Sequence, residues 1–283
     1  LGPQEAIGQI VAVMNDLAET HGLDRKRIRF GISCGGPLDS HTGTIYSPPN
    51  LPGWDEVPIV RRIEEAFGGT GRLQNDANAC ALAEWRYGAA RGYQNAVYLT
   101  FGTGMGAGLI LNGRLYEGGS GLAGEVGHVR IAPDGPVGYG KAGSFEGYCS
   151  GGGIAQLARR AILRRVELGE PLGFAARIRD VASITAEDVG RAAANGDPVA
   201  IDILTVSGRY LGLGVSILID ILNPEAIIIG SIYARCQQFL EGPMREVIAQ
   251  EALAEASKAC KIVPPALGEA VGDYAALATA VQD

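Results

Sequence analysis

The chain has 283 residues, of which 47% are hydrophobic and 19% are charged, and its formal net charge is -7. This composition supplies enough apolar side chains for a large buried core, and the length suits two compact domains or one large one. The acidic balance argues against a nucleic-acid-binding surface, but small anionic ligands stay possible because backbone N–H groups can bind them.

The cysteines argue against a disulfide framework. Their number is odd, they lie far apart, and none of them forms a C-x-x-C pattern, which favours reduced thiols in a cytosol. No segment is predicted to reach the apolar length of a membrane span, and no signal peptide precedes the first helix. We therefore expect a cytoplasmic protein. The five cysteines are Cys34, Cys80, Cys149, Cys236 and Cys260.

The first third of the chain alternates predicted helices and strands. Apolar residues at helical spacing predict a helix over residues 6–18, and His21 and Gly22 follow as its stop. The later elements are a strand over 28–34, a Pro-rich loop over 47–54, a helix over 59–67, a short strand over 72–74 and an Ala-rich helix over 76–87.

The remainder continues the alternation, which predicts an α/β fold. A hairpin is expected around the two-residue turn Asn112-Gly113. The other expected elements are a strand from 96, a strand over 128–131, a helix over 154–166, a helix capped by Thr185, a long helix over 198–222, a buried strand from 226, a helix over 242–257, a strand over 261–267 and a helix over 274–281.

A G-x-G-x-x-G pattern occurs in GYGKAG, at Gly138, Gly140 and Gly143, and again from Gly119 to Gly124. A dinucleotide-binding turn needs a strand before it, a helix after it and an acidic residue after the next strand. No apolar strand follows at the right distance, because residues 154–170 are helical and basic. The dinucleotide interpretation is therefore rejected.

Two glycine turns are candidates for phosphate or nucleotide binding. The stretch TFGTGMGAGLI predicts a strand, a turn that carries Thr103, and a second strand, and its glycines allow close backbone approach. A tight hairpin that needs only glycines explains this stretch equally well. The AIIIGS stretch, which ends in Gly230 and Ser231, is a second candidate, although an ordinary strand end is the simpler reading of it alone.

Polar residues gather at three places. Asn75 and Asp76 stand at the start of a predicted helix, where Asp76 could be a helix cap or a general base. Glu125 and His128 are three residues apart, and Glu146 follows the Gly-rich loop. Carboxylates and an Asn amide suit a polyhydroxyl ligand, while a metal held by Glu125 and His128 is the competing interpretation.

Several motifs occur in an order that resembles the ROK family of sugar kinases and sugar-responsive repressors. The resemblance covers about residues 28 to 277. The motifs are SPPNLPGW, NDANACALAE, LTFGTGMGAGLILNGRLYEGGSGLAGEVGH, FEGYCSG and LGLGVSILIDILNPEAIIIG.

The resemblance implies an actin-like ATPase (ribonuclease H-like) fold, with two α/β domains flanking a cleft. Residues 1–94 plus 268–283 would form the smaller domain, and residues 95–267 the larger one. ATP would phosphorylate a hexose, with glucose at the 6-hydroxyl as the favoured substrate, and Mg²⁺ would bridge the phosphates. The family also implies a homodimer.

The resemblance also assigns roles to individual residues. Asp76 would be the catalytic base that takes the hydroxyl proton. Thr103 and Gly104 would contact the ATP phosphates, and Gly230 and Ser231 would lie near the adenosine. The expected sugar ligands are Asn50, Asn75, Glu125, His128 and Glu146.

One departure from the family concerns zinc. The family usually carries C-x-C-G-x-x-G-C-x-E after its G-H pair, whereas this chain has Val137, Tyr139 and Ser144 at the three cysteine positions. Apolar, phenolic and hydroxyl groups are poor zinc ligands in such a loop. We therefore expect no structural zinc, with His128 free for the sugar.

A second departure concerns the N-terminus. The phosphate-binding D-x-G-G-T turn that opens the family has no match, and we expect it in residues upstream of Leu1 rather than a sugar-binding relic. The chain as printed should then transfer phosphate poorly. The alternatives are an N-acetylhexosamine kinase, an inactive sugar-binding protein, or a sugar-responsive repressor whose DNA-binding segment lies upstream.

Overall fold

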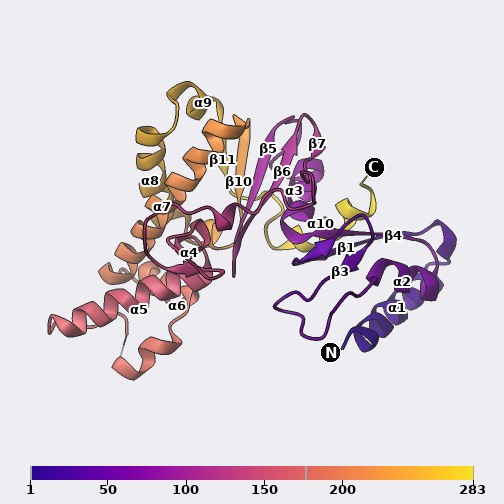
Figure 1. Ribbon diagram of the computed structural model, residues 1–283, viewed down its shortest axis with the longest axis horizontal. Helices are drawn as coiled ribbons and strands as arrows, with labels where there is room; N and C mark the ends of the chain where they lie inside the picture. The colour runs from indigo at the N-terminus through magenta and orange to yellow at the C-terminus, as the bar shows by residue number, and fades with distance from the viewer. Residues whose placement is uncertain (1, 176, 283) are drawn as a thin grey trace.

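The computed structural model describes residues 2–175 and 177–282, and Figure 1 shows their arrangement. The N-terminal part is a small sheet with helices packed against it, and the long helices over residues 151–167, 198–222 and 232–251 lie on the other side of the molecule. In chain order the first elements are α1 (Pro3–Thr20), η1 (Arg25–Arg27), β1 (Arg29–Cys34), β2 (Leu38–Asp39), β3 (Thr44–Ile45), α2 (Ile59–Phe67), β4 (Thr70–Asn75) and α3 (Asp76–Tyr87).

The second group of elements builds the larger sheet and the loops beside it. They are β5 (Ala96–Phe101), β6 (Met105–Leu111), β7 (Arg114–Leu115), η2 (Val126–His128), β8 (Val137–Gly138), β9 (Lys141–Ala142) and α4 (Phe145–Tyr148). The remaining elements are α5 (Gly151–Glu167), η3 (Ile178–Ser183), α6 (Ala186–Ala194), α7 (Pro198–Leu222), β10 (Ala226–Ile229), α8 (Ile232–Glu251), α9 (Ala254–Ala259), β11 (Lys261–Val263), η4 (Gly268–Ala270) and α10 (Val271–Ala280).

Three of the expected elements differ from the structure in type or by four or more residues at one end. The strand expected over 128–131 is absent, because His128 ends the short helix η2 and Arg130 makes only an isolated bridge to Ser144. The helix expected over 242–257 begins at Ile232 and ends at Glu251, with Pro243 inside it. The strand expected over 261–267 ends at Val263.

The larger sheet has the order β11-β10-β5-β6-β7. Strand β10 runs parallel to both β5 and β11, whereas β6 is antiparallel to β5 and to β7. In the small sheet, β1 and β4 are parallel, and Cys34 lies opposite Asn75. The carboxyl end of that small sheet therefore leads directly into the start of α3.

Side chains of the larger sheet alternate between two cores, as the pleat of a strand requires. Val97 and Leu99 of β5 face the core that holds α5, α7 and α8, while Tyr98 of β5 faces the core that holds α3 and α10. A third core lies between α1, α2 and the small sheet. Helix α10 packs on β1 and also contributes Ala275 and Ala278 to the core beside the larger sheet. The predicted domain division at residues 94–95 and 267–268 stays a prediction.

Helix α7 amends one expectation from the sequence. By length and composition alone, its 25 residues could cross a membrane, so the chain does contain a segment of that apolar length. The helix packs along α8, and residues such as Leu211, Val215 and Ile219 are fully buried in the large core. Its apolar character is therefore explained by packing inside the protein.

A buried carboxylate ties α3 to the segment that leads into α10. The Glu84 side chain is fully buried and accepts backbone hydrogen bonds from Ala89 at 2.6 Å, Ala266 at 3.1 Å and Leu267 at 3.0 Å. A buried charge is tolerated when donors satisfy it in this way. Glu84 thereby fixes the 266–267 backbone against the end of α3.

We expect Glu84→Gln to lower the free energy of unfolding by about 3 kcal/mol, because both Glu84 oxygens accept from backbone N–H groups and the NH2 group that replaces one of them cannot accept. Urea denaturation followed by circular dichroism measures the change. Glu65→Gln is the control, since Glu65 is exposed and forms a surface ion pair with Arg61 within α2. A Glu84→Gln protein as stable as this control would contradict the assigned role.

Candidate functional site

Strand β6 brings the start of α3 close to the glycine turn after β5. A Cβ atom at Gly108 would overlap Ala77 O and Ala81 Cβ of α3, and one at Gly106 would lie 3.6 Å from Ala77 Cβ. Glycine at these positions therefore lets the helix backbone approach the strand closely. As a result, Asp76, the first residue of α3, lies beside the beginning of β6.

Asn75 and Asp76 stand at the start of α3, where Asn75 precedes the helix and Asp76 is its first residue. Asn75 is the helix cap, since its Oδ1 accepts a hydrogen bond from Ala77 N at 3.0 Å, and Asp76 Oδ1 accepts from the same N–H at 2.8 Å. The Asp76 side chain is open to solvent, yet many protein atoms surround it. This partial desolvation raises the pKa of the Asp76 carboxyl, although the backbone hydrogen bonds act in the opposite direction.

Glu125 and His128 meet across the turn η2, with His128 Nε2 and Glu125 Oε2 3.8 Å apart. The turn lies against β6, because a Cβ at Gly124 would overlap Ala107 O and one at Gly127 would overlap Met105 O. Both side chains stay partly exposed. Two polar groups are thus presented to solvent near the start of β6.

Glu146 contacts the glycine turn directly. Its Oε2 accepts a hydrogen bond from Met105 N at 3.1 Å, and a Cβ at Gly104 would lie only 2.8 Å from the same oxygen. Gly127 and Gly138 leave room for the Glu146 side chain, since added Cβ atoms there would lie 3.2 and 2.7 Å from Glu146 Cβ. Glu146 therefore joins the η2 region to the turn that begins β6.

The loop before Glu146 is a short hairpin of β8 and β9. Tyr139 and Gly140 form its tip with φ values of 42° and 76°, a conformation that suits a tight two-residue turn. The Tyr139 ring lies edge-on to the His128 ring, with centroids 5.0 Å apart, and Lys141 Nζ donates to His128 O at 2.7 Å. The hairpin therefore contacts both the side chain and the backbone of His128.

Hydrogen bonds and packing hold this hairpin in place. The buried Ser144 caps α4 by accepting from Gly147 N at 3.1 Å. Gln156 of α5 bonds both Val137 N, at 2.9 Å, and Val137 O, at 2.8 Å. Phe145 is buried in the large core. Among residues 2–175 and 177–282, no three His, Cys, Asp or Glu side chains lie close enough together to hold a metal ion.

A pocket of about 950 Å³ opens on the other side of the glycine turn. Thr103 and Ser231 line it, together with Gly152 at the start of α5 and Arg159 further along that helix. The backbone shapes this wall, because Gly151 N donates to Gly102 O at 2.8 Å and a Cβ at Gly102 would lie 3.7 Å from Ser231 Oγ. The ends of β5 and β10 thus meet the start of α5 at one wall of the pocket.

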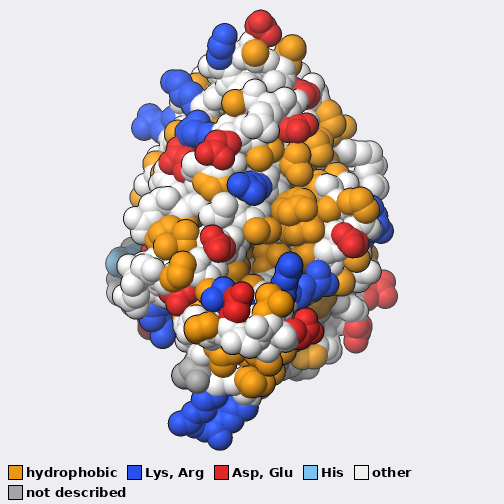
Figure 2. All heavy atoms as spheres, turned by 90° about the vertical axis from the view of Figure 1, so that its left-hand side faces the viewer, with side chains coloured by type: hydrophobic (Ala, Val, Ile, Leu, Met, Phe, Trp, Pro, Cys, Tyr) orange, Lys and Arg blue, Asp and Glu red, His pale blue; other side chains and the backbone are white. Residues whose placement is uncertain are grey.

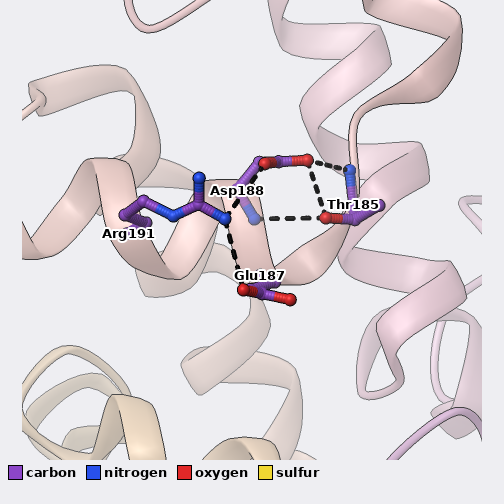
Figure 3. A network of polar contacts seen from close by, with 4 residues as sticks. All are labelled: Thr185, Glu187, Asp188 and Arg191. Carbon is purple, nitrogen blue, oxygen red and sulfur yellow. Dashed lines mark hydrogen bonds and ion pairs between the residues drawn. The ribbon is translucent and has the colours of Figure 1, made fainter.

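Helix α6 forms part of the pocket rim, and Figure 3 shows its first turn. Thr185 and Asp188 form a reciprocal cap, with Thr185 Oγ1 2.7 Å from Asp188 Oδ2. Hydrogen bonds from Thr185 lower the pKa of the Asp188 carboxyl. Arg191 contacts Glu187 at 3.2 Å and Asp188 at 3.5 Å. The cap that the sequence predicted at Thr185 is therefore present.

The expected site residues lie in separate groups. Thr103 and Ser231 line the pocket, whereas Gly104 lies against Glu146 and Gly230 packs against the Tyr98 ring. Asn50 is exposed in the turn before Trp54, and no hydrogen bond between described residues joins it to the other expected sugar ligands. The sequence reasoning did not name the pocket arginines Arg159, Arg191 and Arg235, which carry no local motif.

Comparisons with known proteins agree on one family. The sequence matches the family model described as ROK family over residues 2–282. A glucokinase of Halalkalibacterium halodurans is 32% identical over 258 residues, which cover 90% of this chain and 77% of that protein. These matches extend over both sheets and the candidate site.

Two solved structures are similar in both sequence and shape. A ROK family transcriptional regulator, described as a homolog of the E. coli MLC protein, has a TM-score of 0.81 and 28% identity over 99% of this chain and 69% of that one. A ROK family glucokinase from Streptomyces griseus, solved with glucose and AMPPNP, has a TM-score of 0.77 and 28% identity over 99% of this chain and 88% of that one. Enzymes and regulators are thus both among the similar proteins.

We expect purified protein to contain no stoichiometric zinc and to keep its melting temperature when a strong chelator is added, since a metal that is not bound cannot stabilise the fold. Elemental analysis and thermal unfolding measure this. A triple variant that places cysteine at positions 137, 139 and 144 is the matched control and should acquire zinc beside His128. Stoichiometric zinc in the unaltered protein would contradict the expectation.

Proposed function

This chain belongs to the ROK family, and from that membership we propose that it transfers the γ-phosphate of ATP to a hexose. The actin-like ATPase fold expected from the sequence is confirmed by the family match and the similar kinase structures. Glucose, phosphorylated at its 6-hydroxyl, is the substrate we favour, and an N-acetylhexosamine is the nearest alternative. The position of Asp76 beside the glycine turn is the observation that carries this proposal.

Asp76 has the properties that a general base needs. Its carboxylate stands at the first residue of a helix, is accessible from solvent, and has a raised pKa, which makes it a better proton acceptor than an ordinary aspartate. In the proposed reaction Asp76 takes the proton of the sugar hydroxyl as that oxygen attacks phosphorus. Asn75, immediately before it, would hold a neighbouring hydroxyl through its side-chain amide.

The remaining sugar ligands would come from the far side of β6. Glu125 and His128 present a carboxylate and an imidazole from η2, and Glu146 has one oxygen on Met105 N while its second oxygen could accept from a sugar hydroxyl. Asn50 would approach from its exposed turn. Each hydroxyl of a hexose is both donor and acceptor, so this mixture of groups suits it.

The pocket beyond the glycine turn suits a nucleotide. Its volume is in the range of small-molecule sites, and hydroxyl groups of Thr103 and Ser231 lie on its wall. Arg159 lines the same pocket, and its Nε is buried without a hydrogen-bond partner among the described residues. Thr103 and Gly104 would contact the phosphates, and Gly230 and Ser231 would lie near the adenosine. When bound, ATP supplies the phosphoryl group and Mg²⁺ offsets its charge.

Sugar-responsive regulation is the second candidate function. The similarity to a ROK transcriptional regulator supports it, since the match has a TM-score of 0.81 and covers 99% of this chain and 69% of the regulator. A regulator would bind sugar at the same residues without transferring phosphate. A screen of the full-length protein with ATP, hexoses and N-acetylhexosamines, which follows both ADP release and sugar binding, separates the two functions. Binding without ADP release would favour the regulator.

We also propose that the protein is a cytoplasmic homodimer. The five cysteines are free thiols, which suits a reducing compartment where ATP is available. Figure 2 shows hydrophobic side chains gathered on the face where α5, α8 and α9 lie. An exposed apolar area of this kind is typical of an interaction surface. Large hydrophobic side chains are exposed on α5, on α7, just after α5 and just before α9. These residues are Leu163, Leu168, Ile217, Ile221 and Leu253.

Replacing Asp76 by asparagine should lower kcat of the full-length kinase by about a thousandfold, because the amide cannot accept the hydroxyl proton. Sugar affinity should change little, since asparagine keeps a similar shape and its oxygen can still accept from Ala77 N. Steady-state kinetics and calorimetry measure the two quantities. Asp16→Asn, an exposed change on α1, is the matched control.

The same enzyme should show an acid limb in kcat/KM. Asp76 must be ionised to act as the base, and burial raises its pKa. As the pH is lowered, kcat/KM should therefore begin to fall while the pH is still above the range in which an ordinary aspartate becomes protonated. An unchanged turnover in Asp76→Asn, or an acid limb below that range, would remove Asp76 from the proposed role.

Ile221→Asp should convert the proposed dimer into monomers, because a charge would then replace an apolar side chain that is 73% exposed. Light scattering coupled to size-exclusion chromatography measures the mass. Val13→Asp, an equally apolar position that is 60% exposed on α1, should leave the dimer intact. A wild-type protein that runs as a monomer at micromolar concentration would contradict the proposal.

A further inference from the structure

Glu117 joins parts of the chain that are far apart in the sequence. Its Oε1 atom accepts a hydrogen bond from the Ser40 hydroxyl at 2.8 Å and a second one from Gln74 Nε2 at 3.1 Å. Ser40 lies in the turn between β2 and β3, Gln74 lies in β4, and Glu117 follows β7. One partly buried oxygen therefore connects the small sheet to the loop that follows the larger one.

Gln74 carries this connection to the start of α3. Its Oε1 accepts hydrogen bonds from Asn75 N at 2.8 Å and from Asn78 Nδ2 at 3.1 Å, while its Nε2 donates to Glu117. Gln74 and Asn78 are both only 2% exposed, so water cannot easily replace these bonds. Turning the Gln74 amide would break the contacts on both sides at once.

The loop after Glu117 needs such a restraint because it is rich in glycine. Gly118, Gly121 and Gly124 have φ values of 74°, 75° and 95°, which glycine adopts without strain but which also leave the free loop many conformations. The loop is bonded to itself by Ala123 N to Glu117 O at 3.1 Å. It ends at Glu125 and His128, whereas the Glu117 side chain secures its beginning.

We propose that Glu117 is a positioning residue that holds the Asn75–Asp76 corner and the loop carrying Glu125 and His128 in one arrangement. A hexose then meets a site that is already formed, so less of its binding free energy is spent on ordering the loop. The role in sugar binding rests on the proposed function. The connection between the two parts of the chain rests only on the hydrogen bonds of Ser40, Gln74 and Glu117.

Three variants separate hydrogen bonding from charge. Glu117→Ala removes both acceptor bonds and should weaken glucose binding by about tenfold. Because a single oxygen accepts both bonds, Glu117→Gln can keep them and should stay within about threefold of the unaltered protein. Ser40→Ala should have an intermediate effect, and combining it with Glu117→Ala should add nothing further. Calorimetry with glucose measures affinity, and kinetics should show KM rising more than kcat falls.

Amide hydrogen exchange of the full-length protein, without sugar, provides a test that does not depend on activity. Glu117→Ala should speed exchange both in the 118–124 loop and at the Asn75 amide, which lie in different parts of the fold. Glu5→Ala, an exposed change on α1, is the control. If the protein binds no hexose, the proposed function is overturned, but the exchange experiment still tests the positioning role of Glu117. Exchange that stays unchanged at either place, or Glu117→Gln behaving like Glu117→Ala, would overturn the positioning role.

Discussion

The close approach of backbone to backbone around β6 is the constraint on which the candidate site depends. Gly108 lets α3 pack directly against the strand, and Gly124 and Gly127 let the η2 loop do the same along its edge. Any side chain at these positions would occupy space that the neighbouring backbone already fills. Asp76 comes from the start of α3, whereas Glu125 and His128 come from the η2 loop, and they share one region because both segments pack closely against β6.

The same strand begins at the turn that separates the two halves of the proposed reaction. Glu146 binds Met105 N on one side of this turn, while Thr103 lines the pocket on the other. A sugar held by Glu146 and a nucleotide held near Thr103 would therefore contact neighbouring residues of one short segment. This arrangement supports the proposed phosphate transfer at a glycine turn that by itself is equally consistent with a tight hairpin.

The loop before Glu146 differs from the zinc motif that the resemblance to the ROK family predicts. Its three cysteine positions carry Val137, Tyr139 and Ser144, and the structure gives each of them a contact of another kind. Val137 is bonded through its backbone to Gln156, Tyr139 lies against His128, and Ser144 caps α4. Each contact is weak compared with a metal–thiolate bond, but together they involve both the backbone and buried side chains. The hairpin thus keeps a defined shape that presents Glu146.

The sequence by itself determined the local elements and the family. The helices over 59–67, 76–87 and 198–222 and the hairpin at Asn112-Gly113 are confirmed, because apolar periodicity and turn chemistry act over a few neighbouring residues. Motif order alone identified the ROK family. Local pattern failed at 128–131, where the residues suggested a strand although Val129 N bonds Val126 O to close η2 and Arg130 forms only an isolated bridge to Ser144. Only the tertiary structure decided which polar groups meet, such as Glu117 with Ser40 and Gln74 or Glu146 with Met105 N. These pairs are separated by dozens of residues and follow no local period, so their contact depends on how the sheets and loops pack together.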